Sequence, residues 1–578
     1  MIDALWIAEN GLWVYGLAVI LAASSWASWQ AARARIGLRA MVASSRAGLW
    51  LDSGAILIAA SLALSAHSAL EQVVWVALAL VFAVRTSLAV AGGPFSMWSV
   101  GSPEAAGQQC VLPRASGPLG AVAGAIERLE PALLLVAAPF MLFPGPFTPW
   151  LMPLLILPWL ARGFTKRRHS ARSPMDGPVL VLLAMLLVSL LVSTDRQQSM
   201  PKFYGVAYGI AVFFGLVNHV RRPRHALIAG LGIAGAGLVV SALSLVGTSW
   251  PGGGRQLLPA AWRGLPEAMA RLGASTVAGF NANEVAGTMS LFIPLVASVL
   301  LLGFGDPTSM DEDHSLSQVT AHVGVLQGLL ALTLLLMLAN LVLAHSRSAL
   351  LGVAAALLAL AVLSRRRLWL ILAVALLLFA LAWRGLGTAG ILNPWQVLSG
   401  VRNVQARVEL WKRAIYMLQD FAFTGVGLNR FSATANALYP LFTIAPEEVL
   451  LLTHAHNVFL QVAVDLGIPG LVGYVALLLD TLLAWQAARA RLRGGLLQAI
   501  SVGLLCSLIG YHVYGLGDCM TLGAKPGLAL WAVLGLLAAL ANLTVEPNGL
   551  GSSASANPEE RSGISLRAAG NGENRNGR

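Results

Sequence analysis

The sequence is poor in charge and cysteine, and it lacks the motifs of nucleotide-dependent enzymes. Of its 578 residues only 11% are charged, whereas 57% are hydrophobic. The three cysteines, Cys110, Cys506 and Cys519, form no CxxC pair, which excludes a disulfide framework. The chain has no Walker loop, no Rossmann glycine pattern, no serine-centred elbow and no internal repeat. The composition that remains is typical of a multi-spanning helical membrane protein.

The charge balance is basic, and its distribution explains why. Lys and Arg total 38 against 26 Asp and Glu, giving a net charge of +12. In a soluble protein this excess would suggest a nucleic-acid partner. Here most of it falls in short loops between apolar runs, where positive charge sets the orientation of membrane helices. We therefore expect a membrane protein with no nucleic-acid partner.

Apolar runs near the length needed to cross a bilayer predict about fifteen helices, about three N-terminal and about twelve in a core. The two proline-marked runs that open the core are compatible with either a thin hairpin or a re-entrant pair. The expected segments are 9–29, 49–66, 70–91, 131–145, 149–162, 178–194, 204–220, 226–248, 279–303, 321–345, 349–363, 368–385, 457–485, 497–516 and 526–543.

These segments predict an all-α, polytopic membrane protein in four parts. Residues 1–91 form an N-terminal transmembrane extension, and the Gly-, Pro- and Ser-rich residues 92–130 form a cytoplasmic linker. Residues 131–545 form the membrane core, in which residues 386–455 are a long periplasmic loop. Residues 546–578 are a disordered cytoplasmic tail.

The basic loops all fall on one side of this topology. The first of them lies between Arg33 and Arg46, so the positive-inside rule places it in the cytoplasm. The N-terminus is then outside, the C-terminal tail is cytoplasmic, and the long loop 386–455 is external or periplasmic.

A histidine is expected at the outer mouth of the helix that follows this loop. His456 opens the pattern H-N-x9-G-x-x-G, which ends in Gly467 and Gly470. Three residues apart on one helix face, the two glycines would let a neighbouring helix approach closely. The alternative for either half of the pattern is structural, with the histidine capping a helix and the glycines serving packing alone.

Two arginines are expected at the same face. Arg347 lies in the turn HSRSALLG between two apolar helices, where an unpaired guanidinium is costly near hydrocarbon. The alternative is an interfacial arginine that snorkels to water. Arg407 lies near the start of the amphipathic segment 401–431, which can lie on the membrane surface or form an interfacial helix without a catalytic part. The residues at helical spacing in that segment are Arg407, Leu410, Trp411, Ala414 and Ile415.

Arginine and histidine together indicate a particular chemistry. A guanidinium can bind two oxygens of a phosphate or diphosphate, and a neutral imidazole can accept a proton from a hydroxyl near pH 7. Together they fit group transfer from a lipid diphosphate. The D-x-D sequence at Asp311–Asp313 falls in a loop assigned to the cytoplasm, across the membrane from His456. We therefore expect chemistry without a metal and without a cofactor.

Several short motifs follow one another in order along roughly residues 130–545: GFNANEVAG, HSRSALLG, ARVELWKRA with GVGLNRF, HAHNVFLQVAVDLGIPG and GLGDCMTLGAKPGLALW. In this order they resemble the O-antigen ligases and polymerases of bacterial envelope biosynthesis. The resemblance implies a GT-C-type glycosyltransferase of the bacterial inner membrane. Such enzymes move a glycan from undecaprenyl diphosphate to a hydroxyl on lipid A core, another glycan or a protein.

By motif, the resemblance places the catalytic roles on Arg347, Arg407 and His456. His454 is a second histidine candidate. Further candidates for donor or acceptor binding are His454, Asn457, Asn281, Asn283 and Arg402, although an asparagine at position 281 or 283 equally suits a helix cap. The N-terminal extension departs from the family pattern. Two other functions stay open: a small-anion transporter, such as a bicarbonate carrier, and a non-catalytic scaffold of the same fold.

Overall fold

The structure is a computed structural model, and the part of the chain that it describes is almost entirely helical. All described residues belong to one compact unit, Met1–Leu543. Within them the only β-type pairing is an isolated bridge between Thr248 and Phe280. The described residues are 4–34, 36–38, 41–42, 47–66, 68–91, 118–166, 169–251, 280–304, 316–364, 373, 377, 394–440, 454–492 and 495–543.

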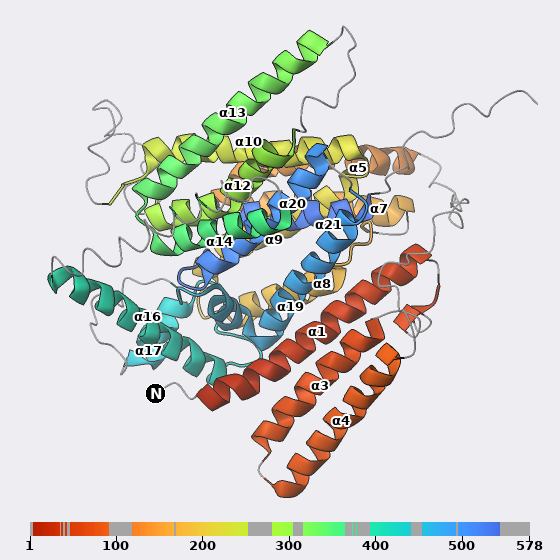
Figure 1. Cartoon of the computed structure of the whole chain (residues 1–578), viewed down its shortest axis with the longest axis vertical. Coiled ribbons are helices and arrows are strands. Elements are labelled where there is room, and N and C mark those ends of the chain that lie inside the picture. The colour runs from red at the N-terminus through yellow and green to blue at the C-terminus, as the bar shows by residue number, and fades with distance from the viewer. Residues whose placement is uncertain are drawn as a thin grey trace, which may run out of the picture. The chain divides into compact units, whose positions relative to one another are not determined.

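The helices follow the apolar runs of the sequence closely (Figure 1). They are α1 (Ala4–Ala34), α3 (Ala47–Ser65), α4 (Ala69–Ala91), α5 (Pro118–Leu142), α6 (Thr148–Leu151), α7 (Pro153–Lys166), α8 (Asp176–Val192), α9 (Arg196–His219), α10 (Pro223–Gly247), α12 (Ala282–Leu302), α13 (Leu316–Leu343), α14 (Arg347–Ser364), α16 (Pro394–Asp420), α17 (Phe431–Leu438), α19 (Val458–Arg489), α20 (Gly495–Gly515) and α21 (Gly527–Asn542).

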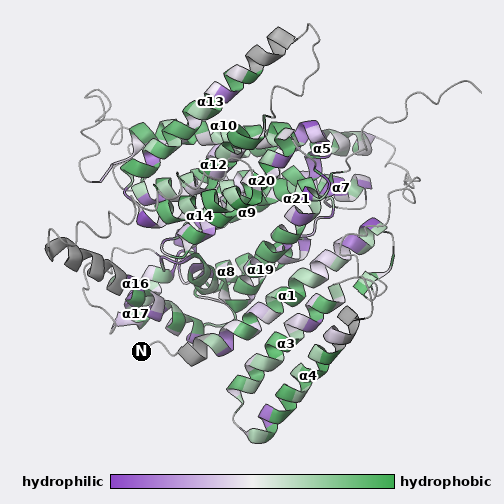
Figure 2. Cartoon of the chain, viewed as in Figure 1, coloured by the Kyte–Doolittle hydropathy of each residue, from purple (hydrophilic) through white to green (hydrophobic). Residues whose placement is uncertain are grey.

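Hydrophobic residues cover most of these helices along their whole length (Figure 2). Within the described residues, nine helices are long and apolar enough to cross a membrane, namely α1, α3, α9, α10, α12, α13, α14, α19 and α20. Three shorter apolar helices lie in α4, α8 and α21. The chain is therefore an all-α, polytopic membrane protein, as predicted. The expected segment 368–385 lies almost wholly outside the described residues.

One predicted boundary is wrong. The helix α5 begins at Pro118, so residues 118–130, which we assigned to the linker, are helical. This helix continues through Pro131 and Pro139 to Leu142. A proline disrupts a helix less where neighbouring groups satisfy the carbonyl that it leaves unpaired. The proline at 131 was therefore a poor marker of a helix start.

The N-terminal extension packs on the core through α1. Val14, Ala18 and Ala22 of α1 form one buried cluster with Val472 and Ala476 of α19. Toward the other end of α1, the Ser25 hydroxyl donates to the carbonyl of Pro174 over 2.7 Å, and the Trp29 indole donates to Asn542 over 2.9 Å. Small residues permit this close approach of two apolar helices.

Basic loops from three parts of the chain meet at the C-terminal end of α21. Arg33 and Arg491 each donate to the carbonyl of Ala541 over 3.0 Å, and Asn542 donates to the carbonyl of Arg172. Cations suit this position because the last carbonyls of a helix carry partial negative charge. Arg491 directly follows the end of α19, whereas His456 precedes its start. The histidine thus lies at the end of α19 opposite to these basic residues.

The helix α19 is broken at Gly467. This residue has φ 70° and ψ 177°, a conformation essentially confined to glycine. The prediction that Gly467 and Gly470 share a regular helix face is therefore wrong. Backbone from the loop after α16 fills the break: Val426 N donates to Val464 O over 2.8 Å, and Ile468 N donates to Ala422 O over 2.7 Å.

The same loop is fixed on its other side by α8 and α9. The backbone of Leu428 is fixed by two hydrogen bonds. Its N–H donates to the Ser189 hydroxyl over 2.9 Å, and its carbonyl accepts from the Ser199 hydroxyl over 2.7 Å. Arg430 then binds Gln198 and Asp195 at the start of α9. The loop 421–430 is thus held between the break in α19 and the ends of α8 and α9.

Replacing Gly467 with alanine should destabilise the fold by about 2 kcal/mol or more. The new residue would be strained at φ 70°, and its Cβ would lie 2.4 Å from the carbonyl oxygen of Phe423. The measurement is thermal unfolding of the purified protein in detergent. Gly232→Ala is the matched control, because a Cβ at this helical position meets nothing within 4 Å. Equal unfolding temperatures for the two variants would contradict the role given to the break.

Candidate functional site

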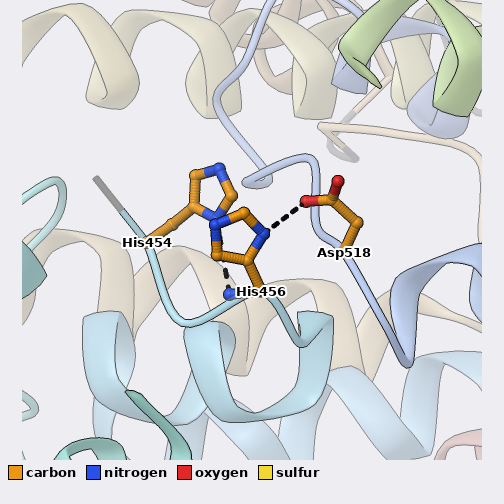
Figure 3. Close-up of side chains that lie close together, drawn as sticks. All are labelled: His454, His456 and Asp518. Carbon is orange, nitrogen blue, oxygen red and sulfur yellow. Dashed lines mark hydrogen bonds and ion pairs between the residues drawn. The ribbon is translucent and has the colours of Figure 1, made fainter. Parts of the chain in front are cut away.

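The predicted histidine is paired with a carboxylate that comes from a different part of the chain. His456 Nδ1 lies 2.9 Å from Asp518 Oδ1. The histidine precedes α19, and the aspartate lies in the turn between α20 and α21. Figure 3 shows the Asp518 carboxylate pointing at the His456 ring, with the His454 ring beside it. The His456 side chain is 16% exposed and that of Asp518 5%, so solutes reach the imidazole but hardly the carboxylate.

Asp518 is held in its anionic form. Burial by itself would raise the pKa of this carboxyl group, but the hydrogen bond from His456, the two nearby imidazoles and the backbone N–H of Cys519 outweigh burial and lower the pKa below its usual value. Cys519 N also donates to Asp518 Oδ1 over 2.8 Å. An anionic acceptor at Nδ1 fixes the proton of a neutral His456 on that nitrogen. Its Nε2 lone pair is then the atom that can accept a proton.

His454 is the buried partner in this group. Its Nδ1 accepts from the backbone N–H of His456 over 3.4 Å and lies 3.4 Å from Cys519 Sγ. Burial, and then the nearby His456, lower the pKa of His454 to about 4. His454 is therefore neutral at physiological pH, whereas the exposed edge of the site belongs to His456.

Arg407 and the residue that follows Arg347 meet the same turn. A Cβ added at Gly517 would lie 2.8 Å from Ser348 Oγ and 4.0 Å from Arg407 Nη1. Ser348 follows the exposed Arg347 at the start of α14, and Gly517 precedes Asp518. The structure thus brings the segments that carry Arg347, Arg407 and His456 together around one turn, although they are more than a hundred residues apart at the extremes of the sequence.

Asparagines cap the N-termini of two helices near this turn. Asn457 caps α19 by accepting from Phe459 N and Leu460 N, and its amide donates to the carbonyl of Leu516 over 3.3 Å. Asn281 caps α12 in the same way. The carbonyl of Asn283 accepts from the Tyr514 hydroxyl over 3.2 Å. The structural alternative is therefore confirmed for Asn281. Arg402 lies in α16, but its side chain is outside the described residues.

The backbone of the histidine loop is tied to the interior of α19. Ala455 N donates to Gln461 Oε1 over 2.7 Å, and Gln461 Nε2 donates to Asp465 Oδ1 over 2.9 Å. Both side chains are buried. Buried polar groups linked in this way fix a unique conformation. A recess on this side of the loop is lined by Leu428, Val458, Gln461, Val462, Asp465, Leu466, Met520, Thr521 and Leu522.

The apolar face of α16 packs on protein, which corrects the expectation that it rests on the membrane surface. Leu410 and Ala414 are buried together with Val426, Ala455 and Val464. The helix that carries Arg407 is therefore docked on the start of α19 and on the loop that fills its break. This contact gives the guanidinium a defined position beside the turn at Gly517.

Strained backbone is concentrated in these segments. Among the described residues, the non-glycine residues with positive φ are His345 (52°), Asn429 (59°) and His456 (48°). One lies beside Arg347, one lies in the loop that fills the break in α19, and one is the candidate base. Such conformations cost free energy and persist where the surrounding structure enforces them, which is common at functional sites.

The same group of side chains has the donors of a metal site. The ligand atoms of His454, His456 and Asp518 all lie within 4.8 Å of one another. Two imidazoles and a carboxylate are typical ligands of zinc and related ions. These ligands do not show whether the reaction itself uses a metal, so the expectation of metal-independent chemistry stays a prediction.

Asp518 is the site residue that residue-by-residue reasoning on the sequence missed. It stands in the piece GLGDCMTLGAKPGLALW, which contributed to the resemblance but received no role. The signal was an acidic residue directly after a helix whose expected end lies on the same face as His456. A single carboxylate in a loop is common, so only its contact with the imidazole distinguishes it.

A comparison with known protein families finds a match over the part of the chain that carries the three predicted catalytic residues. Residues 332–475 match the family model described as O-antigen ligase. This stretch contains Arg347, Arg407 and His456, whereas Asp518 lies beyond it. The predicted resemblance to the O-antigen ligase and polymerase family is confirmed over this stretch, and it supports a membrane glycan-transfer function. No curated protein matches the chain significantly.

The low pKa of His454 predicts how the stability of the fold depends on pH. Between about pH 6.5 and 4, His454 is protonated in the unfolded chain but stays neutral in the folded protein. The free energy of unfolding therefore falls as the pH falls through this window. The total loss is about 3 kcal/mol. His454→Gln should flatten this dependence, measured as unfolding temperature against pH. The exposed control His225→Gln should retain it, and parallel curves for wild type and His454→Gln would contradict the assignment.

Proposed function

We propose that this protein is a GT-C-type glycosyltransferase of the O-antigen ligase or polymerase kind. It transfers a glycan from undecaprenyl diphosphate to a hydroxyl acceptor at the periplasmic face of the bacterial inner membrane. The observation that carries the proposal is the His456–Asp518 pair beside the turn that also meets Arg407 and Ser348. The N-terminus is then periplasmic and the C-terminal tail cytoplasmic.

The base in this reaction is His456. With its Nδ1 proton directed to Asp518, the ring accepts the proton of the acceptor hydroxyl at Nε2 while the hydroxyl oxygen attacks the anomeric carbon. The carboxylate stabilises the imidazolium that forms, since opposite charges attract strongly in a poorly solvated site. Asp518 therefore acts through His456 and is a positioning residue.

The two arginines act on the other end of the bond that breaks. As the glycosyl group leaves, negative charge grows on the diphosphate oxygens. The guanidinium groups of Arg347 and Arg407 can each bind two of these oxygens and stay charged at any ordinary pH. They hold the diphosphate and stabilise the leaving group without a metal. Asn457, Asn283 and Arg402 are the further candidates for contacts to the remaining parts of donor and acceptor.

A carrier of small anions is the second candidate function. It would place its ionisable groups near the middle of the membrane in broken helices. One observation favours it: α19 is broken at Gly467, and Asp465 lies buried next to the break. However, loop backbone fills this break, and Arg347 and His456 lie at or just before the starts of α14 and α19. The enzyme is therefore the better supported function.

Loss of the base or of an arginine should abolish most of the transfer. We expect His456→Ala to reduce kcat by about 10²–10⁴-fold, and Arg347→Lys and Arg407→Lys by about 10²–10³-fold. The assay uses purified protein with an undecaprenyl-diphosphate-linked glycan and a glycan acceptor. Arg224→Lys, an exposed arginine at the start of α10, is the control with full activity. Uptake of a small anion by liposomes without any glycan transfer would instead establish the carrier.

The role given to Asp518 predicts a specific kinetic change. Asp518→Asn preserves the shape of the side chain but removes the charge that stabilises the imidazolium, so kcat should fall by about 10²–10⁴-fold while KM changes little. Asp518→Glu should restore part of kcat. A rise in KM with unchanged kcat would show that Asp518 serves only to hold the turn in place.

A further inference from the structure

The cluster beside His456 contains a fourth donor that the proposed reaction does not use. Cys519 is buried and directly follows Asp518. Its Sγ lies 3.4 Å from His454 Nδ1, and His454 in turn contacts the backbone of His456. The ligand atoms of His454, His456 and Asp518 lie within 4.8 Å of one another, and the sulfur of Cys519 adjoins this group at His454.

We propose that His454, His456, Asp518 and Cys519 bind a soft divalent ion of the zinc type. Zinc takes four nitrogen, sulfur or oxygen ligands in a tetrahedron, with bonds of about 2.0–2.3 Å. The ligand atoms of such a tetrahedron lie roughly 3.3–3.7 Å apart. The observed separations are 2.9 Å for His456 Nδ1–Asp518 Oδ1 and 3.4 Å for His454 Nδ1–Cys519 Sγ, and a rotation of the Cys519 side chain would bring its sulfur toward the other three donors.

The donors also select the kind of ion. Imidazole and sulfur favour zinc, cobalt and copper, whereas magnesium and calcium require shells made mostly of oxygen. One carboxylate and one thiolate balance the double charge of the ion, and the thiol releases its proton to solvent when the metal binds. The two histidine rings lie with their centroids 4.2 Å apart, and His456 forms the side of the site that solvent reaches.

A metal here would regulate the reaction, and this step rests on the proposed function. A neutral His456 that binds zinc through Nδ1 carries its proton on Nε2, so Nε2 can no longer accept the proton of the acceptor hydroxyl. A metal bound to Asp518 also removes the anion that orients the ring. The resting transfer needs no metal, so bound zinc would switch it off. His456 thus belongs to two mutually exclusive states, the base of the transferase and a ligand of the ion.

The test is binding of Co²⁺ to the full-length, chelator-treated protein in detergent. We expect one Co²⁺ per chain, an absorption band of sulfur-to-cobalt charge transfer, and displacement of the cobalt by Zn²⁺. Loss of even an outer partner of a ligand weakens a metal site by about 10–100-fold. His454→Gln and Cys519→Ser should therefore weaken Co²⁺ binding at least tenfold, and Cys519→Ser should abolish the band. Cys506→Ser, a buried cysteine within α20, should retain both.

Absence of stoichiometric Co²⁺, or a band that survives in Cys519→Ser, would overturn the site. The regulatory step is tested separately, as the ratio of transfer rates with and without Zn²⁺ in each protein. Zn²⁺ should inhibit the wild type and Cys506→Ser at least tenfold and should inhibit Cys519→Ser much less. Because Co²⁺ absorption needs no glycan substrate, a protein that binds metal but transfers nothing would refute the proposed function and leave the metal site standing.

Discussion

The arrangement of this protein depends on a break in one membrane helix and on the backbone that fills it. A helix interrupted at Gly467 leaves peptide groups without partners, and in a bilayer each of them costs several kcal/mol. Val426 N and Ala422 O restore two of these hydrogen bonds. The loop after α16 therefore cannot leave α19 without exposing polar backbone. This constraint fixes α16, and with it Arg407, beside the start of α19.

The candidate site is assembled from segments that are remote in the sequence. α14 brings Arg347, α16 brings Arg407, the cap of α19 brings His456, and the turn after α20 brings Asp518. Gly517 precedes Asp518, and the absence of a side chain there admits both Ser348, the neighbour of Arg347, and Arg407. The opposite end of α19 is occupied by the basic residues that bind the last carbonyls of α21.

The chemistry proposed for the site follows from competition for one imidazole. Asp518 Oδ1 can direct the proton of His456 so that the ring accepts another, or it can share a metal ion with that ring. Both uses need the same buried carboxylate, kept anionic by its neighbours. His454, neutral and buried, and the thiol of Cys519 contribute only to the second use. The strained φ of His456 is consistent with a ring that the fold positions closely.

The sequence by itself determined the class of the protein and the approximate bounds of most helices, and it predicted three candidate site residues. It could do so because hydrophobic length and basic loops act locally, and because Arg347, Arg407 and His456 stand in recognisable motifs. Only the tertiary structure decided the rest. In the sequence, Gly467 looks like a packing residue, and only its backbone conformation shows the break in α19. The sequence also does not indicate whether Leu410 and Ala414 face lipid or protein. Asp518 is an ordinary loop carboxylate in the sequence, and only its contact with His456 distinguishes it. Each of these depends on contacts between segments distant in the chain, which no local pattern of residues encodes.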